Sequence, residues 1–311
     1  MGRRRVCDAS TTRRHEHAGM TGERLALAQR ATLAPLLAAR WRDANAVETT
    51  LADPWFANLY LFRAAHDWRW WPGEWPCIAG HGYDGARLLL PLFELHDAPV
   101  EVLRGLLAQG DTGASFGPLS AEQAVRLDPA LWSCTSHRDD ADYLYPADQF
   151  RQYRGRLLQK KRNLAKQLLA AHPVDAVPYT PSLADEAARV LTGWMEDKAK
   201  APGDTDDGPC LEALALSDEL GLEGTLYRIE GRAAGFLLAE TIGTDVMVMR
   251  FAKALNTYKG LYQHMFQQFC IARPALRWLN FEQDLGQANF RQTKLSYQPS
   301  ALLDKFRASL R

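Results

Sequence analysis

The stretch that decides the fold is 224–254, "GTLYRIEGRAAGFLLAETIGTDVMVMRFAKA". It contains three runs rich in apolar and β-branched residues, and a Glu-Gly-Arg turn separates the first two. Short turns of this kind join antiparallel neighbours. The stretch therefore predicts a meander of three antiparallel strands.

Helical and strand patterns extend outward from this meander in both directions. Helical apolar spacing precedes it at 148–171, 180–201 and 210–221, and a helix at 259–274 and a strand at 276–282 follow it. A short helix and a final strand region, 295–308, complete the second half. Helices, then a meander, then helix and strands indicate an α+β fold with a mostly antiparallel sheet. This order is similar to the core of a GCN5-related acyltransferase.

The first half has a weaker pattern of the same kind. An amphipathic helix is expected at 23–41, a short helix at 53–65, short strands within 67–94 and a helix at 98–110. We therefore expect a disordered basic leader over 1–22, an N-terminal domain over 23–141 and a C-terminal domain over 142–311. The leader has two further interpretations: a nucleic-acid or lipid tether, or an artefact of an upstream start site.

Composition excludes several classes of protein. The 311 residues carry 37 basic and 37 acidic side chains, so net charge indicates no partner. Five scattered cysteines without a CxxC pair favour reduced thiols in the cytoplasm and no zinc or other metal site. No apolar run approaches the roughly 20 residues that span a bilayer. Contact with a membrane surface stays open.

Four tryptophans gather in a short part of the first half. They are Trp68, Trp70, Trp71 and Trp75. Such a cluster can form the wall of a ligand site, but it more often packs in a core. Core packing is the favoured interpretation.

The strongest electrostatic feature lies in the helix predicted at 148–171. Seven cations occur there and no acid lies between Gln149 and Val174: Arg151, Arg154, Arg156, Lys160, Lys161, Arg162 and Lys166. Like charges on one helix oppose its folding, and a polyanion compensates them. The alternative is a solvated face paired with acids from elsewhere in the chain. The absence of local acids favours a phosphate-bearing partner.

The turn 256–263, "NTYKGLYQ", joins the last meander strand to the next helix. In acyltransferases that use coenzyme A, this place holds a loop of the form [R/Q]-x-x-G-x-[G/A], whose amides hold the pyrophosphate. Aligned on Gly260, Thr257 replaces the Arg or Gln, and Tyr262 replaces the small residue. The turn disfavours coenzyme A and leaves an ester-activated donor open. Its candidate substrate-binding residues are Tyr258, Lys259, Gly260, Tyr262 and Gln263.

Two charges interrupt the meander itself. Glu240 ends one apolar strand and Arg250 lies within the next. A charge on such a strand either points to solvent or belongs to a site. Sequence alone leaves both readings open, so both residues are candidates for substrate binding.

The stretch 280–299, "NFEQDLGQANFRQTKLSYQP", gathers ionisable groups at the end of a strand. Glu282 and Asp284 would project from one face if the strand continues, and Arg291 and Lys294 would share a face of the following helix. A carboxylate can accept a proton from a nucleophile, and a cation can stabilise an oxyanion. The alternative is a structural network of ion pairs.

Two of these charged stretches, 157–167 and 280–299, resemble a known family. "LLQKKRNLAKQ" (157–167) is similar to the "GKKxxKKRNxINxF" helix of the phosphatidylglycerol lysyltransferase C-terminal domain family, and 280–299 is similar to its "NxExDLGxxGLRxAKxSYxP" signature. The resemblance covers about 50–308. It implies tandem GCN5-related acyltransferase folds, the first degenerate. It also implies aminoacyl transfer from aminoacyl-tRNA to a hydroxyl or amine of a lipid or small molecule, without a cofactor.

The resemblance also implies roles for individual residues. The first motif falls on Lys160, Lys161, Arg162 and Asn163, and the second on Glu282, Asp284, Leu285, Gly286, Arg291, Lys294, Ser296 and Tyr297. Glu282 or Asp284 would orient or deprotonate the nucleophile, and Arg291 and Lys294 would stabilise the oxyanion. The acceptor stem of tRNA would lie against 150–167. The chain departs from the family motifs at two places. Gln159 replaces a Lys or His, and the pair Asn289-Phe290 replaces Gly-Leu.

Two rival hypotheses follow from the same residues. The first is an acyltransferase that uses acyl-coenzyme A, despite the altered turn at Gly260. The second is a non-catalytic module whose basic helix binds anionic lipid or RNA. The large membrane segment of the lipid enzymes has no counterpart in the chain, which puts a lipid acceptor in more doubt than the fold.

Overall fold

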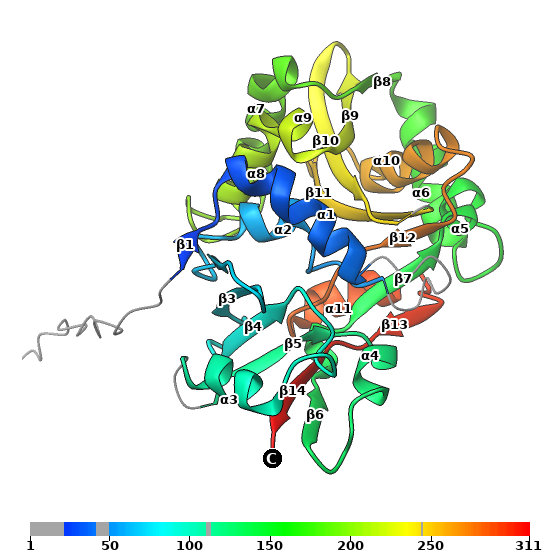
Figure 1. Cartoon of the computed structure of the whole chain (residues 1–311). Coiled ribbons are helices and arrows are strands. Elements are labelled where there is room, and N and C mark those ends of the chain that lie inside the picture. The colour runs from blue at the N-terminus through cyan, green and yellow to red at the C-terminus, as the bar shows by residue number, and fades with distance from the viewer. Residues whose placement is uncertain (1–21, 42–49, 110–112, 244) are drawn as a thin grey trace, which may run out of the picture.

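The described part of the computed structural model, residues 22–41, 50–109, 113–243 and 245–311, forms two seven-stranded sheets (Figure 1). The expected leader 1–22 lies outside it, apart from Gly22. The first sheet has the order β1 (Glu23–Arg24), β2 (Arg69–Trp71), β3 (Cys77–His81), β4 (Arg87–Pro91), β5 (Ser115–Leu119), β14 (Phe306–Leu310) and β6 (Trp132–Ser136). The second has the order β13 (Ala301–Leu303), β7 (Asp142–Pro146), β12 (Trp278–Asn280), β11 (Val246–Ala254), β10 (Arg232–Thr241), β9 (Leu222–Ile229) and β8 (Val174–Pro178).

Both sheets repeat one arrangement. In the first, β3 and β4 are antiparallel, and helix α3 (Val100–Ala108) leads to β5, which is parallel to β4. In the second, β10 and β11 are antiparallel, and helix α10 (Leu261–Ile271) leads to β12, which is parallel to β11. The remaining pairs are antiparallel. The predicted α+β class and the three-stranded meander are confirmed.

The chain crosses twice between the two sheets, and one strand of the second half, β14, joins the first sheet. After β6 the chain crosses to the second sheet, where β7 lies between β12 and β13. After β13 it crosses back, and β14 lies between β5 and β6. The final strand region expected at 295–308 is therefore two short strands in different sheets. Alternation of residue types marks a strand but does not specify its partner, so the sequence pattern did not separate them.

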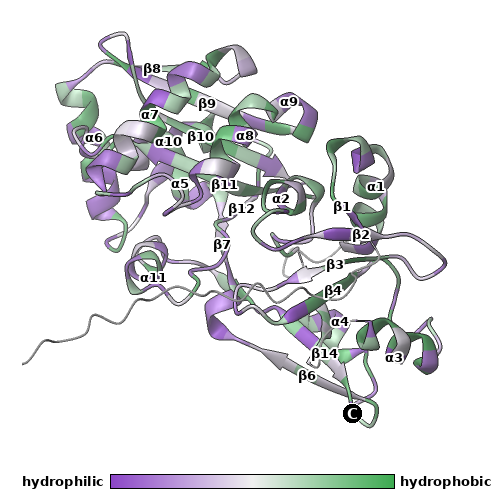
Figure 2. Ribbon diagram, turned by 90° about the vertical axis from the view of Figure 1, so that its left-hand side faces the viewer, coloured by the Kyte–Doolittle hydropathy of each residue, from purple (hydrophilic) through white to green (hydrophobic). Residues whose placement is uncertain are grey.

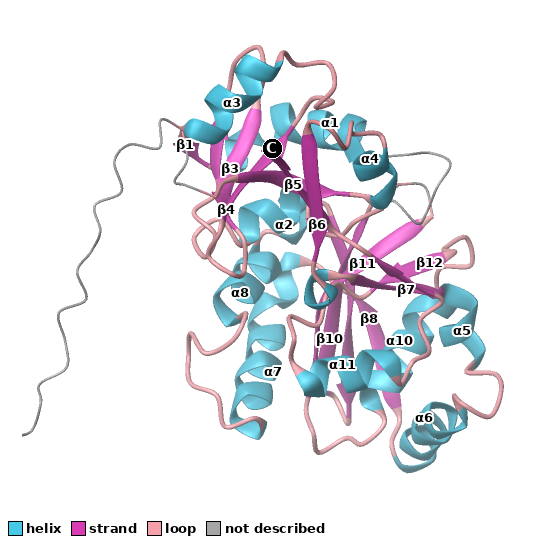
Figure 3. Ribbon diagram, turned by 90° about the horizontal axis from the view of Figure 1, so that it is seen from below, coloured by secondary structure: helices cyan, strands magenta, loops and turns pink. Residues whose placement is uncertain are grey.

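Helices cover the sheets on distinct faces. In Figure 3, α7 (Ala184–Asp197) lies on one side of β10 and α10 lies on the other. Each sheet with its helices forms one lobe. Helices α1 (Arg30–Trp41), α2 (Phe56–Leu61), α7 and α8 (Asp207–Ala215) share one apolar core with strands of both sheets, so this core joins the two lobes. Helices α5 (Ala147–Gln152), α6 (Gln159–Ala171) and α10 enclose a second, aromatic-rich core. The remaining α-helices of the described residues are α4 (Ala121–Val125), α9 (Ser217–Leu220) and α11 (Ala288–Leu295).

Apolar side chains explain these layers. Figure 2 shows hydrophobic residues concentrated on the strands and on the inner sides of the helices. Trp68 is buried in the core that joins the lobes, and Trp71 is buried in a third core beneath α3. The favoured interpretation of these two tryptophans as core residues is confirmed.

The prediction of one helix over 148–171 is wrong in one respect, because the structure has two helices there. Helix α5 ends at Gln152, Tyr153 takes a left-handed conformation with φ 44°, and α6 starts at Gln159. Gly155, with φ 83°, continues the break. Burial of Tyr153, whose hydroxyl donates to the Gln263 carbonyl at 2.9 Å, supports the unusual conformation.

Candidate active site

The site begins where two parallel strands separate. Strands β11 and β12 pair only over Val246–Val248 and Trp278–Asn280. The ladder between β10 and β11 is shifted, since Leu238 pairs with Phe251 and Ala239 with Met249. Arg250 is therefore the extra residue of a β-bulge, a feature that redirects a side chain.

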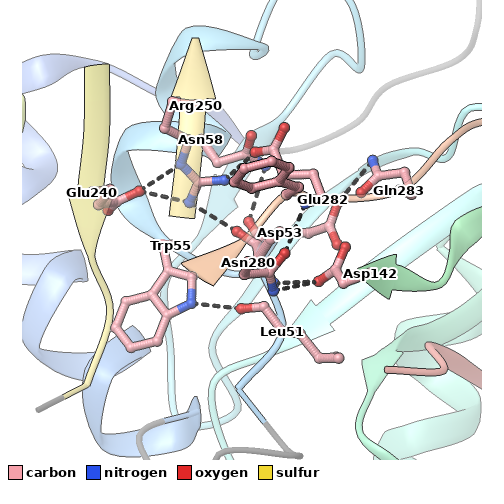
Figure 4. Close-up of polar contacts among 12 residues, drawn as sticks. Leu51, Asp53, Trp55, Asn58, Asp142, Glu240, Arg250, Asn280, Glu282 and Gln283 are labelled. Carbon is pink, nitrogen blue, oxygen red and sulfur yellow. Dashed lines mark hydrogen bonds and ion pairs between the residues drawn. The ribbon is translucent and has the colours of Figure 1, made fainter. Parts of the chain in front are cut away.

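The redirected side chain of Arg250 bridges the gap between the strands (Figure 4). Its Nη1 donates to Glu282 Oε1 at 2.6 Å, and its Nε donates to Glu240 Oε2 at 2.8 Å. Nη2 donates to the Ala52 carbonyl at 2.8 Å, and Ala52 lies in the segment before α2. The Arg250 side chain is 1% exposed. Both charges of the meander thus belong to a buried network and neither points to solvent.

Glu282 is the accessible member of this network. Its side chain is 27% exposed, and its backbone N–H donates to Asn280 Oδ1 at 2.7 Å. Burial raises the pKa of Glu282 above its usual value, although Arg250 and Lys294 oppose the shift. A carboxylate with a raised pKa that solvent can reach is suited to accept a proton from a nucleophile.

Asp284, in contrast, is completely buried and fully paired. Arg291 donates to both of its oxygens at 2.9 Å, the Tyr143 hydroxyl donates at 2.5 Å and the Gly286 N–H at 2.9 Å. Burial opposes the charge, yet these hydrogen bonds lower the pKa of Asp284 well below its usual range. The group therefore remains ionised and fixes the segment that carries it.

The expectation that Glu282 and Asp284 share one face is wrong. Strand β12 ends at Asn280, and Glu282 and Leu285 take left-handed conformations with φ 57° and 53°. Because the backbone is no longer extended, alternation does not hold and the two carboxylates enter separate networks. Reaching these conformations needs tertiary contacts that the local pattern does not contain.

Helix α11 presents its two predicted cations to this segment. Arg291 pairs with Asp284 and Asp139. Lys294 Nζ donates to the carbonyls of Phe281, Glu282 and Gln283. Burial lowers the pKa of Lys294 to about 8. Both residues lie on one side of α11, as predicted, and both hold the backbone around Glu282.

A pocket of about 620 Å³, counting its open mouth, is lined by Gln283, the residue that follows Glu282. We call it the inter-lobe pocket. Its lining comes from strands and loops of the first sheet, α2 and the residues on either side of it, the turn before β7, and the two segments that follow β12 and β13. The lining residues are Asp53, Asn58, Leu59, His66, Trp68, His81, Gly82, Tyr83, Leu88, Leu90, Pro118, Asp140, Gln283, Lys305, Phe306 and Arg307. The sequence patterns did not indicate this set, with the exception of Trp68. Trp68 belongs to the tryptophan cluster, for which a ligand wall was the less favoured interpretation. Its members come from distant segments with no shared motif.

The seven cations of the predicted basic helix have two different environments. Arg151 caps α10 by donating to carbonyls from Cys270 to Leu276, and Arg162 donates to the Tyr153 carbonyl. Lys161 donates to Ser296 Oγ at 2.7 Å and lies 3.8 Å from the Tyr297 ring centre, and burial lowers its pKa to about 8. The other four are exposed and form no ion pair within the described chain: Arg154, Arg156, Lys160 and Lys166. Asn163 is exposed beside them.

The turn before α10 is covered by α6. Gly260 caps α10 with φ 98°, and a Cβ atom added there would lie 2.2 Å from the Leu164 carbonyl oxygen. Gln263 donates to the Tyr297 hydroxyl at 2.9 Å, and the Tyr262 hydroxyl accepts from the Ala254 N–H at 3.2 Å. The neighbouring Tyr258 is half-buried and Lys259 is exposed. The predicted turn residues thus mainly pack α10 against its neighbours.

The described residues contain neither a membrane-spanning helix nor a cluster of metal ligands. No helix in them is both long and apolar enough to cross a membrane. No three His, Cys, Asp or Glu side chains in the same ranges gather to hold a metal ion.

Two sheets that share this strand arrangement, one after the other in the chain, define a tandem acyltransferase fold. The family model described as "Phosphatidylglycerol lysyltransferase, C-terminal" matches residues 46–309, and the chain belongs to this family. The resemblance seen in the two motifs is confirmed. Membership places the chain in a transferase family, and no curated protein sequence matches it.

Solved structures agree on the fold. A conserved protein of unknown function from Bacteroides thetaiotaomicron has a TM-score of 0.75 and 23% identity, covering 94% of this chain and 99% of that one. L-PGS from Bacillus licheniformis has a TM-score of 0.60 and 13% identity, covering 93% of each chain. A tandem GNAT protein from the clavulanic acid biosynthesis pathway has a TM-score of 0.50 and 13% identity, covering 92% and 97%. The chain has the tandem GCN5-related acyltransferase-like fold that its motifs imply.

Proposed function

We propose that this protein transfers an aminoacyl group from aminoacyl-tRNA to a hydroxyl or amine of a lipid or small molecule. One observation carries the choice of donor. Helix α6 lies across the N-terminus of α10 and bears two exposed cations, Lys160 and Lys166, and the linker before it bears two more; none of the four has an acidic partner among the described residues. The proposal is an extension of the family's transferase chemistry to this chain.

The covered helix N-terminus argues against acyl-coenzyme A as the donor. A pyrophosphate bound there needs free N–H groups and close approach of the backbone. The Leu164 carbonyl oxygen lies within 2.2 Å of where a Gly260 Cβ would be, so this space is filled, and a carbonyl oxygen repels phosphate. The exposed cations of α6 provide what RNA needs, because each phosphate contact releases counterions.

The chemistry follows from the groups around Glu282. The acceptor oxygen or nitrogen attacks the ester carbonyl, forming the new acyl bond while the bond to the ribose oxygen breaks. Glu282 takes the acceptor proton and returns it to that ribose oxygen. Asp284, Arg291 and Lys294 position the segment carrying Glu282, since their polar atoms already hold it. Neither Arg291 nor Lys294 lines the inter-lobe pocket, so the proposal gives both residues a positioning role and no oxyanion contact.

The test is a transfer assay with two donors and two acceptors. Purified protein is incubated with tRNA charged with labelled amino acids, or with labelled acetyl-coenzyme A. Acceptors are vesicles containing phosphatidylglycerol, or a mixture of small amines. We expect label to pass only from charged tRNA. Label passing only from acetyl-coenzyme A would overturn the choice of donor, and no transfer from either would overturn the catalytic function.

A further inference from the structure

The two cations that line the inter-lobe pocket, Lys305 and Arg307, are each paired with two carboxylates. Lys305 pairs with Asp53 and Asp142, and it also donates to Gln283 Oε1 at 2.7 Å. Arg307 pairs with Asp84 at 2.6 Å and Asp140 at 3.7 Å. Lys305 has no donor left over for an anionic ligand, and Arg307 has carboxylates beside both Nη1 and Nη2 that offset its charge.

Negative charge is in excess in the same region. Three cations each hold two carboxylates: Lys305 with Asp53 and Asp142, Arg307 with Asp84 and Asp140, and Arg250 with Glu240 and Glu282. Lys294 also acts on Glu282 and Asp142, so six carboxylates face four cations, and these groups favour a positively charged ligand over a negative one.

Two hydrogen-bond acceptors in the pocket receive no hydrogen bond from the described residues. His66 is only 8% exposed, and its Nδ1 lies 2.8 Å from the His81 carbonyl oxygen. A carbonyl can only accept, so Nδ1 carries the proton, and because burial lowers the pKa of His66 the ring is neutral. Its Nε2 thus keeps a lone pair, which accepts no hydrogen bond from any described residue. Asn58 donates its amide N–H to the Asp53 carbonyl at 3.1 Å, and no described residue donates to its Oδ1.

Aromatic rings form the adjoining wall. The His66 ring contacts Tyr83 edge-on at 4.6 Å between ring centres, and Trp68 lies 5.6 Å from it. Electron-rich faces of Trp and Tyr attract cations. Free acceptors, excess carboxylates and aromatic walls together match one chemical group, a protonated amine.

We propose that the inter-lobe pocket binds a primary ammonium group. His66 Nε2 and Asn58 Oδ1 accept its hydrogen bonds, and Asp53 and Asp140 balance its charge. The biological meaning rests on the proposed function, in which such a group belongs either to the aminoacyl donor or to an amine acceptor. Both sources present the same chemistry to the pocket.

Binding to the full chain tests the proposal without tRNA. Isothermal titration calorimetry is performed with n-butylamine and L-alaninamide near neutral pH, where both carry ammonium groups. Butan-1-ol and propionate serve as neutral and anionic controls of similar size. We expect saturable binding of at least one amine and none of the controls. Binding of propionate as tight as that of the amines, or no saturable binding of either amine, would overturn it.

Variants locate the binding in the pocket. Loss of one hydrogen bond to a charged group weakens binding about tenfold or more, and we expect this for His66→Phe and for Asn58→Leu. Asn58→Asp adds negative charge and should tighten amine binding, which keeps the test valid if His66→Phe fails to fold. Asp128→Asn, at an exposed position outside the pocket, should leave it unchanged. Equal affinity in wild type and in all Asn58 variants would contradict the site.

The transfer assay then separates the two sources. An amine that is recovered as its aminoacyl amide is an acceptor, whereas an amine that competes with charged tRNA and is not consumed occupies the aminoacyl position. The two proposals also fail separately. Amine binding without transfer from charged tRNA overturns the proposed function alone. Transfer that Asn58→Leu leaves unchanged, together with unchanged amine affinity, overturns the pocket alone.

Discussion

Arg250 and Glu282 join two parallel strands through their side chains at the point where the backbone ladder stops. The distance from Arg250 Nη1 to Glu282 Oε1 is 2.6 Å, two residues beyond the last backbone pair, Val248 with Asn280. The same guanidinium reaches the Ala52 carbonyl in the other half of the chain. One buried cation therefore connects the strand gap, the candidate base and the interface between the lobes.

This connection predicts a large loss of stability when the cation is removed. Arg250→Met leaves Glu240 and Glu282 without their partner, and breaking a buried pair costs about 3–5 kcal/mol. Urea unfolding measures the loss in the free energy of unfolding. Arg277→Met, at a 72% exposed side chain that pairs with Asp245, is the matched control and should change little. Similar values for the two variants would contradict the buried network.

Glu282→Gln should abolish most of the transfer activity while the protein stays folded. A general base contributes about 10²–10⁴-fold in rate. Because the pKa of Glu282 is raised above its usual 4.5 and only the ionised form accepts a proton, the wild-type rate should rise with pH through that raised pKa. Rates measured from pH 4 to 8 check both points. A rate for Glu282→Gln equal to that of Glu223→Gln, an exposed control, would remove Glu282 from the mechanism.

The pair formed by Asp284 and Arg291 predicts acid sensitivity. The pKa of Asp284 is lower in the folded state than its usual 3.8, so its contribution to stability is complete above about pH 4 and is lost as pH falls below that. Asp284→Asn should cost about 3 kcal/mol at pH 7. Thermal unfolding at several pH values measures it, and the gap between variant and wild type should narrow from pH 5 to pH 2. A gap that does not change with pH would contradict the ionised, paired state of Asp284.

Gly260 offers a test of the packing between α6 and α10. Gly260→Ala must accept both a positive φ, about 1–2 kcal/mol, and the clash with the Leu164 carbonyl. Gly231→Ala has a similar φ, 76°, with no atom within 4 Å, so it isolates the backbone cost. Denaturant unfolding should show a larger loss for Gly260→Ala. Equal losses would mean that α6 does not cover the turn.

Local patterns predicted much of the fold, because helices and strands have their own periods. The three strands between Leu222 and Ala254, the helix that follows them and helix α11 were all expected. The left-handed residues Tyr153 and Glu282 were not, since tertiary contacts stabilise them. The crossing of β14 into the first sheet depends on a partner nearly 200 residues away in the chain.

Local patterns also predicted part of the candidate site, because some of its residues lie in stretches with a clear pattern. Glu282 and Arg250 lie in recognisable stretches, and the structure brings them together. His66, Asn58 and Lys305 come from separate segments that look ordinary one by one. Only the arrangement of the two lobes makes them neighbours, and no spacing rule along the chain contains that information.

The most direct measurement of the central claim is single-turnover transfer from charged tRNA by charge-reversal variants of α6. Lys160→Glu with Lys166→Glu should lower the second-order rate at least tenfold and reduce its dependence on salt, because phosphate contacts are lost. Lys198→Glu with Lys200→Glu, at two exposed lysines at and just beyond the end of α7, is the matched control and should react like wild type. Equal rates and equal salt dependence for both pairs would contradict the account that α6 receives the RNA donor.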